Sequence, residues 1–387
     1  MKLIYLDNAA TTPTSPEVLG AMLPYFSEFF GNPSSIHSYG QEAREAVEKA
    51  RDQLSALLGA HSEEIIFTSG GTESDNAALK GVAYALKDKG NHIITTSIEH
   101  HAIIETSKFL EKQGYKVSYL PVDRYGMVNP NDVKKAITLQ TILVSVMHAN
   151  NEMGTIQPIS EIAKITHQAG IYFHTDAVQT VGHIPFSVGE LGIDLLSLSA
   201  HKFNGPKGVG ALYIRKGTKI IPFMSGGEQE RSLRAGTYNV PSIVGLGKTA
   251  ELTQKSLSQE MIRVIKLRDR LTQGILGGIK DTYLNGHPSR RLPGNVNVSI
   301  DFIEGESVLL NLDIKGICAS TGSACSSASL EPSHVLLAMG ISPEKAHSSI
   351  RFSLGKESTE ADIDRVLEAL PLIVAKLRAM SPLVKPG

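Results

Sequence analysis

The sequence places three chemical groups in an order that suggests one kind of chemistry. Lys202 follows a predicted strand, and a buried lysine can lose its charge and react with an aldehyde. Asp176 ends an earlier predicted strand, where its carboxylate could keep a pyridine nitrogen protonated. Gly71 and Thr72 open a predicted helix, whose free backbone amides and dipole favour a phosphate. An amine, an acid and a phosphate loop are what pyridoxal phosphate needs, so we predict a site for that cofactor.

Each of these groups also has a purely structural interpretation. A lone lysine after a strand is usually a solvated charge, and Asp176 would suit a helix N-cap. The run 70–72 lacks the spacing and the lysine of a P-loop, so alone it is a turn before a helix. Only the combination favours the cofactor. Ser199 and His201, on either side of position 200, are predicted as further phosphate donors.

The elements that must position these groups alternate between strand and helix patterns. Helices separate several strands, which are predicted at 65–67, 93–96, 117–120, 141–146, 172–176, 195–198 and 211–214. Such alternation predicts an α/β fold with a largely parallel sheet covered by helices on both faces. Ligands of these sheets bind beyond the carboxyl ends of the strands, and the chemical residues follow predicted strands.

The pattern changes after about residue 252. A long helix at 261–275, strands at 296–300 and 350–354, and helices from 306 and from about 359 predict a second, α+β domain. We therefore predict a large domain over 12–255 that binds the cofactor. The small domain would combine residues 1–11 with 256–387.

Composition excludes several classes of partner. The chain has 387 residues, with 38 basic and 39 acidic side chains and a net charge of −1. This balance gives no electrostatic reason to expect nucleic acid or an anionic membrane as partner. No apolar run approaches the length of a membrane span, and residues 1–7 lack the apolar core of a signal peptide, so we expect a cytoplasmic protein.

The two cysteines, Cys318 and Cys325, are too few for a disulfide framework or a four-thiolate metal site, so no intrinsic metal is expected. Cys325 lies in a run of small polar residues, 320–329, which predicts an exposed, mobile loop. That setting favours a nucleophilic thiolate, provided that its pKa is lowered or a base is near. Cys318 follows a helix and is predicted to be a packing residue.

Six motifs make the chain resemble the NifS/IscS-type cysteine desulfurases, in the class V aminotransferase family of fold type I pyridoxal-phosphate enzymes. The resemblance extends from residue 5 to residue 383, and its most specific pieces are at 31–35, 67–74, 150–152, 201–208, 322–325 and 351–355. It implies a large domain with a mainly parallel seven-stranded sheet between layers of helices. A smaller α+β domain would carry the Cys325 loop.

The resemblance also implies a role for individual residues around the cofactor. Lys202 matches the lysine that holds the cofactor covalently, and Asp176 matches the partner of the ring nitrogen. Gln179 matches the donor to the phenolic oxygen. His100 matches the imidazole that stacks on the ring and shuttles protons. The matches to phosphate ligands are Gly71, Thr72, Ser199, His201 and, reaching in from the second subunit of a homodimer, Thr237.

The implied substrate is L-cysteine. Arg351 matches the arginine that clamps its carboxylate, with Asn32 and Asn151 assisting around the substrate and cofactor. The products would be L-alanine and a persulfide on Cys325, which is passed to acceptors, above all for iron–sulfur cluster assembly. An iron–sulfur scaffold protein is therefore an expected partner, and Cys325 could briefly share an iron ligand with it.

Two alternatives remain open on these residues. A selenocysteine lyase, or another class V enzyme, would share Lys202, Asp176 and Arg351. A non-catalytic sulfur-trafficking or scaffold-binding protein could also keep the fold, because fold alone does not decide function. The complete set of site residues favours an enzyme.

Overall fold

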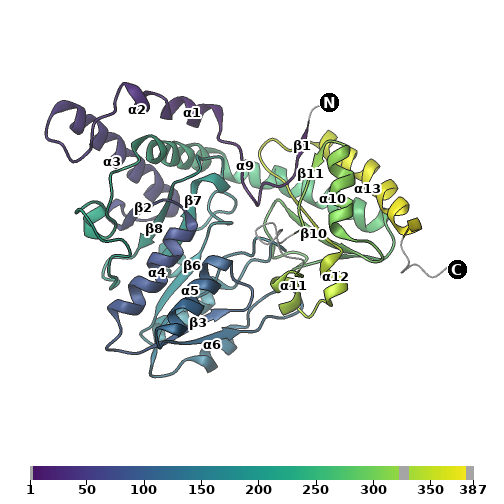
Figure 1. The fold of residues 1–387 in the computed structure, drawn as a ribbon, viewed down its shortest axis with the longest axis horizontal. Coiled ribbons are helices and arrows are strands. Elements are labelled where there is room, and N and C mark those ends of the chain that lie inside the picture. The colour runs from purple at the N-terminus through teal and green to yellow at the C-terminus, as the bar shows by residue number, and fades with distance from the viewer. Residues whose placement is uncertain (1–2, 322–330, 381–387) are drawn as a thin grey trace.

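The computed structural model describes residues 3–321 and 331–380. It has a large unit built on a seven-stranded sheet and a smaller unit built on a three-stranded sheet (Figure 1). The strands are β1 (Ile4–Tyr5), β2 (Ile65–Thr68), β3 (His92–Thr96), β4 (Lys116–Leu120), β5 (Thr141–Ser145), β6 (Tyr172–Asp176), β7 (Leu195–Ser199), β8 (Gly210–Ile214), β9 (Thr282–Leu284), β10 (Asn295–Ile300), β11 (Ile317–Cys318) and β12 (Ser349–Ser353).

The helices are α1 (Pro16–Met22), α2 (Pro24–Ser27), α3 (Ser38–Leu58), α4 (Gly71–Ala85), α5 (His101–Lys112), α6 (Pro130–Ala136), α7 (Ile159–Gln168), α8 (Val188–Leu191), α9 (Val240–Gly278), α10 (Gly305–Ile314), α11 (His334–Ala338), α12 (Pro343–His347) and α13 (Glu360–Met380). Short 3-10 turns are η1 (Ser62–Glu64), η2 (Ala200–Lys202) and η3 (Glu230–Ser232).

The seven-stranded sheet has the order β2-β8-β7-β6-β5-β3-β4. Strand β8 runs antiparallel to both of its neighbours, and the other pairs are parallel. Side chains alternate between the two faces, so in β2 Ile65 and Phe67 join one core and Ile66 joins the other. Helices α4 and α5 cover one face, and α3, α6, α7 and the first part of α9 cover the other. The predicted mainly parallel α/β fold is confirmed.

Helix α3 shows how the sequence defines an element. Its buried positions recur at helical spacing and form one stripe, with Ala43, Val47, Ala50, Leu54 and Leu58 facing the core. The helix ends at Gly59, whose φ of 65° is left-handed and whose N–H bonds to the carbonyl of Ser55. A glycine adopts this conformation without steric cost, so Gly59 suits the C-cap of the helix.

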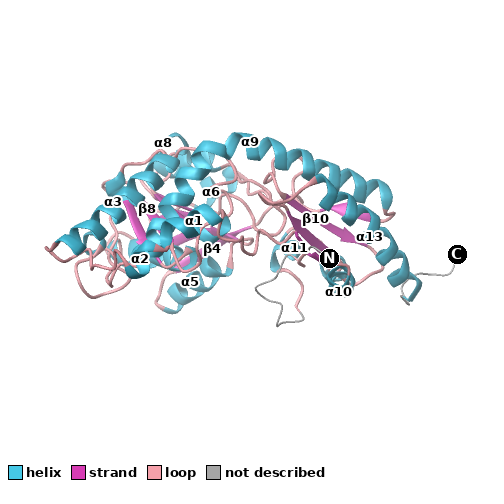
Figure 2. Cartoon of the chain, turned by 90° about the horizontal axis from the view of Figure 1, so that it is seen from above, coloured by secondary structure: helices cyan, strands magenta, loops and turns pink. Residues whose placement is uncertain are grey.

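Helix α9 runs along both units (Figure 2). Its first part packs on α3 and its last part on α13. The sequence predicted only the part from 261 to 275, because the middle of the helix bridges two cores and has no continuous apolar stripe. In the structure the helix begins at Val240, and the Asn239 side chain accepts a bond from the N–H of Ser242. The predicted domain boundary at 255 falls inside α9 and stays a prediction.

The smaller unit combines both ends of the chain. Its sheet has the order β12-β10-β9, and β1 pairs with β11 beside it. After β1 the chain crosses to the large unit, where the N–H of Thr12 bonds to the carbonyl of His201 at 2.8 Å. Residues 7–12, which we call the crossing segment, therefore lie between the two units. In the part of the chain that the structure describes, no helix is long and apolar enough to cross a membrane.

Candidate active site

Residues of both units line a cavity of about 390 Å³. The cavity lies at the carboxyl ends of β6 and β7, beside the segments that follow β2 and β3. Parallel sheets bind their ligands at this edge. The predicted site residues that line it are Gly71, Thr72, His100, Asn151, Asp176, Gln179, Ser199, His201, Lys202 and Arg351. Segments far apart in the sequence thus meet here.

Lys202 follows β7 in the turn η2 and projects into this cavity from the large unit. Its Nζ donates to the carbonyl oxygens of Ala9 and Ala10 at 2.7 and 2.9 Å. Its own carbonyl accepts a bond from His183 Nε2 at 2.9 Å. The lysine turn is therefore held both by the crossing segment and by a side chain behind it.

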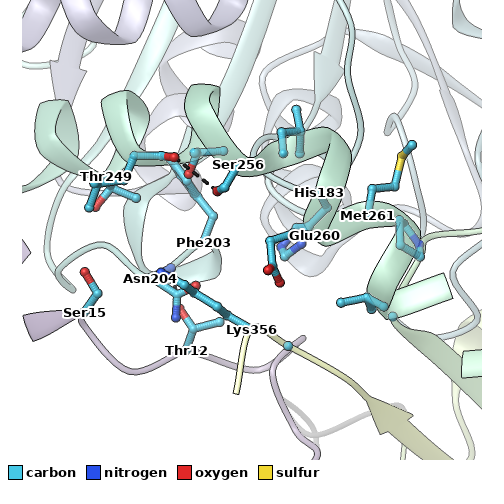
Figure 3. A pocket seen from close by; sticks show the side chains of 18 of the residues that line it. Thr12, Ser15, His183, Phe203, Asn204, Thr249, Ser256, Glu260, Met261 and Lys356 are labelled. Atoms are coloured by element: carbon cyan, nitrogen blue, oxygen red, sulfur yellow. Dashed lines mark hydrogen bonds between the residues drawn. The ribbon is translucent and has the colours of Figure 1, made fainter. Parts of the chain in front are cut away.

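A second cavity of about 90 Å³ lies behind this turn (Figure 3). Thr12 lies on one side of it and Thr249 of α9 on another, with His183 also in its wall. The Thr12 hydroxyl donates to the His201 carbonyl at 2.9 Å and accepts from the Asn204 N–H at 2.7 Å. Among the described residues that line this second cavity, none is a predicted site residue. The predicted site residues gather instead around the larger cavity.

Asp176 lies at the end of β6, opposite Lys202, and accepts a bond from the N–H of Val178 at 2.9 Å. Burial raises the pKa of Asp176 to about 6, while that backbone bond and the charge of Lys202 oppose the rise. At neutral pH the carboxylate is therefore ionised. A buried anion of this kind can keep a proton on a facing ring nitrogen.

Two further buried carboxyl groups, which the sequence analysis missed, lie close to Asp176. Asp75 of α4 lines the cavity, and burial, followed by the charge of Asp176, raises its pKa well above the usual value. Burial raises the pKa of Glu99 to about 8. Its carboxylate accepts bonds from the Thr96 hydroxyl and the Met147 N–H. Glu99 is therefore mainly neutral at pH 7, and burial likewise favours the protonated form of Asp75.

A sequence signal existed for one of these acids. Asp75 continues the buried stripe that Ala78, Leu79 and Val82 form on α4, so a charged residue interrupts an apolar face. Such a residue is a candidate for a functional role. Glu99 left no comparable local signal, because it lies in a short turn after β3.

His100 caps the start of α5, where its Nδ1 accepts the N–H of Ala102 at 3.1 Å. Burial and then the charge of Lys202 lower the pKa of His100 to about 4. The imidazole is therefore neutral, and its proton is on Nε2 because Nδ1 is an acceptor. A neutral ring in this position can stack on a flat ligand and exchange a proton with it.

The start of α4 forms the anion-binding end of the cavity. Gly71 and Thr72 are the first helical residues, so their N–H groups have no partner within the helix. A Cβ atom on Gly71 would lie 2.6 Å from Val178 Cγ2, so only glycine allows this close approach. Ser199 and His201 line the same cavity, and burial lowers the pKa of His201 to about 4.

Arg351 enters the cavity from β12 of the smaller unit and is only 2% exposed. Its Nη1 donates to the carbonyl of Asn151 at 3.0 Å, and its Nη2 lies 2.8 Å from Asp7 Oδ1. The guanidinium is thus held by groups of both units. Its planar set of donors suits a carboxylate ligand.

Two predicted site residues lie elsewhere. Asn32 and Thr237 do not line the cavity of their own chain, and the Asn32 side chain accepts the N–H of Ser34 in a local turn. Cys325 lies outside the described residues. Cys318 is half-buried on β11, and burial followed by the charge of Asp313 raises the pKa of its thiol. No cluster of side chains that could hold a metal ion occurs within residues 3–321 and 331–380.

The family model for class-V aminotransferases matches residues 4–366. The chain belongs to the class-V aminotransferases. It is 60% identical over 382 residues to the cysteine desulfurase IscS of Methanosarcina thermophila, across 99% of this chain and 94% of that protein. It is 54% identical over 382 residues to cysteine desulfurase 2 of Trichormus variabilis, across 99% and 96% of the two chains.

Solved structures of similar proteins show the same architecture. A NifS-like protein superposes with a TM-score of 0.91 at 41% identity and covers 97% of this chain and 100% of its own. A structure of SspA in complex with cysteine superposes with a TM-score of 0.79 at 35% identity, covering 92% of this chain and 100% of that one. The predicted fold type I architecture is therefore confirmed.

Class-V aminotransferases use pyridoxal phosphate, and the donor set of the cavity fits this cofactor. The amine of Lys202, the carboxylate of Asp176 and the amide end of α4 all line one cavity. The N–H groups of Gly71 and Thr72 have no partner within the helix and can bind a phosphate. The cavity therefore offers one group for each functional part of the cofactor.

Proposed function

We propose that the chain removes sulfur from L-cysteine, giving L-alanine and a persulfide on Cys325. One observation carries the proposal: a carboxylate-binding arginine, Arg351, lines the same cavity as Lys202 and Asp176. A site with these groups suits an amino acid bound beside pyridoxal phosphate. Full-length relatives at 60% identity are cysteine desulfurases, which supports this substrate over other amino acids.

In the proposed mechanism, pyridoxal phosphate, when bound, supplies a sink for the electrons left behind when a proton leaves the α-carbon. Lys202 anchors the cofactor and moves the α-proton with its Nζ. Asp176 holds the proton on the ring nitrogen, which its ionised state at pH 7 allows. Gln179, which lines the cavity, would donate to the phenolic oxygen of the cofactor. His100, neutral and protonated on Nε2, would stack on that ring and could pass a proton through Nε2.

The remaining residues bind the cofactor phosphate and orient the substrate. The N–H groups of Gly71 and Thr72, with Ser199 and His201, hold the phosphate. Arg351 holds the carboxylate of the substrate, and Asn151, whose carbonyl fixes the guanidinium, assists. Asn32 is proposed to approach the substrate only in the assembled enzyme.

Cys325 provides the nucleophile in this proposal. Its thiolate sulfur attacks the sulfur of the bound cysteine and forms an S–S bond. The C–S bond of the substrate breaks, its electron pair stays with the carbon fragment, and protons from the site complete L-alanine. Because the two cysteines of the chain differ in setting, Cys318, with its raised thiol pKa, is assigned no part.

We also propose a homodimer in which Thr237 binds the phosphate of the partner site. Thr237 lies outside the cavity of its own chain, as an intersubunit role requires. Exposed apolar side chains on and after α1 and α2 support an interface there, namely Leu19, Leu23, Phe26, Phe30 and Ile36. The persulfide acceptor is proposed to be an iron–sulfur scaffold protein, and the site of action the cytoplasm.

Incubating the purified protein with L-cysteine tests the proposed reaction. We expect L-alanine to form and, with a thiol reductant, sulfide to be released in equal amount. Absence of alanine would reject the proposal. Much faster alanine formation from selenocysteine would identify a selenocysteine lyase instead.

A further inference from the structure

The carboxylate of Asp7 lies against the arginine that is proposed to bind substrate. Asp7 Oδ1 is 2.8 Å from Arg351 Nη2, and the two side chains are 21% and 2% exposed. Ion pairs with charge-assisted hydrogen bonds are stronger away from water than at the surface. The guanidinium has five N–H donors on several edges, so it can serve a second carboxylate as well.

The position of Asp7 is fixed by the strand that carries Arg351. Asp7 forms a bridge with Ser353 of β12. The N–H of Ser353 donates to the carbonyl of Leu6 at 2.7 Å, and the N–H of Ala9 donates to the Ser353 hydroxyl at 2.9 Å. The backbone of Asp7 is therefore tied to the strand that carries Arg351, which keeps the carboxylate near the guanidinium.

The same short segment also borders the cofactor side of the cavity. The carbonyl of Ala9 accepts bonds from Lys202 Nζ at 2.7 Å and from Gln179 Nε2 at 3.0 Å. Ala9 and Ala10 line the cavity. Asp7 is thus placed at the junction between the carboxylate-binding arginine and the residues proposed to hold the cofactor.

We propose that Asp7 is a specificity-determining residue that shares the Arg351 guanidinium with the substrate carboxylate and limits how tightly that carboxylate is held. The inference rests on the proposed function of Arg351. Two anions on one cation repel each other, so the shared arrangement favours release of the monocarboxylate product. It also disfavours amino acids that bring a second carboxylate.

Replacing the charge of Asp7 without changing its shape tests this directly. In Asp7→Asn holoenzyme we expect propionate, a carboxylate with no amine or thiol, to bind about tenfold more tightly by titration calorimetry than in the wild type. The KM for L-cysteine should fall as well. Propionate affinity that is unchanged or lower in this variant would show that Asp7 only supports the fold, and would overturn the proposal.

Asp269→Asn is the matched control. Asp269 pairs with Arg268 at 2.7 Å on α9 and does not line the cavity, so propionate binding should equal that of the wild type. If Asp7→Asn does not fold, a comparison of two ligands on the wild type still tests the role of Asp7. Succinamate, which is nearly isosteric with succinate but has one charge fewer, should bind more tightly than succinate, and equal affinities would overturn the role of Asp7.

The proposed reaction and the proposed role of Asp7 are tested by different results. If wild-type protein forms no alanine from cysteine, the proposed reaction is wrong, whereas the propionate comparison still reports on Asp7. If alanine forms but Asp7→Asn leaves propionate binding unchanged, only the role of Asp7 is wrong.

Discussion

Removing the charge of Glu230 tests how the phosphate end of the site is held in place. Glu230 pairs with Arg51 at 2.8 Å, and both side chains are 2% exposed. Its Oε2 also accepts the N–H of Phe67 at 2.7 Å. Strand β2, which contains Phe67, leads into the loop before Gly71, and Thr237 follows Glu230 closely in the chain. One carboxylate thus connects the two segments proposed to bind phosphate.

The structure sets the expected magnitude. In Glu230→Gln the amide oxygen can still accept from Phe67, but Arg51 loses its buried counter-charge. Removing one partner of a buried ion pair costs about 3–5 kcal/mol. Arg51 keeps Glu48 at 3.1 Å, a partner that is 53% exposed, so we expect the lower end, about 3 kcal/mol, in the free energy of unfolding.

A double variant separates charge from packing. In Arg51→Met/Glu230→Gln neither buried charge of this pair remains. The bonds from Arg51 to Glu48 and to the Ile65 carbonyl are lost, and that carbonyl keeps a bond from Arg231 Nη1 at 3.3 Å. We expect this variant to lose about 1 kcal/mol, less than either single variant.

Urea unfolding followed by circular dichroism measures these differences in the holoenzyme. Glu251→Gln is the control, because Glu251 forms its ion pairs with Lys248 and Lys255 at the surface, and we expect little change there. A loss below about 1 kcal/mol in Glu230→Gln, or a double variant less stable than both single variants, would refute the reasoning.

Three further outcomes follow from the buried groups of the cavity. Burial raises the pKa of Glu99 to about 8, so between about pH 4.5 and 8 the folded chain keeps a proton that the unfolded chain releases, and stability falls as the pH rises. In Glu99→Gln the urea midpoint should decrease less with rising pH than in the wild type. An unchanged dependence of the midpoint on pH would contradict this role of Glu99. Gly71→Val should weaken retention of pyridoxal phosphate, measured by absorbance after dialysis, because of the 2.6 Å approach to Val178, and full retention would count against the assigned loop. His100→Gln should lower kcat by about a hundredfold or more at unchanged cofactor content, and normal turnover would remove His100 from the mechanism.

The sheet and the groups around the cofactor could be predicted because both depend on local patterns. Runs of three to six residues, rich in apolar side chains, marked the strands of the large sheet. Asp176 ends β6 and Lys202 follows β7, and neighbouring parallel strands bring such residues to one edge. Their convergence on one cavity therefore follows from topology.

Other parts of the site depend on packing that no local pattern records. The pKa values of Asp75 and Glu99 are raised because the surrounding elements bury both side chains. Asp7 meets Arg351 across 344 positions of sequence, through the pairing of the crossing segment with β12. The residues around Thr237 likewise do not indicate that it lies outside the cavity. Its position depends on how η3 and α9, the elements on either side of it, are packed.

The location of the persulfide shows which cysteine is the nucleophile. Purified protein is incubated with L-cysteine, alkylated and digested, and the extra sulfur is located by peptide mass, with Cys325→Ser as the control that should keep the cofactor absorbance. The account predicts the persulfide on Cys325 and none on Cys318, whose thiol pKa is raised by burial. A persulfide on Cys318, or none on either cysteine while L-alanine still forms, would contradict it.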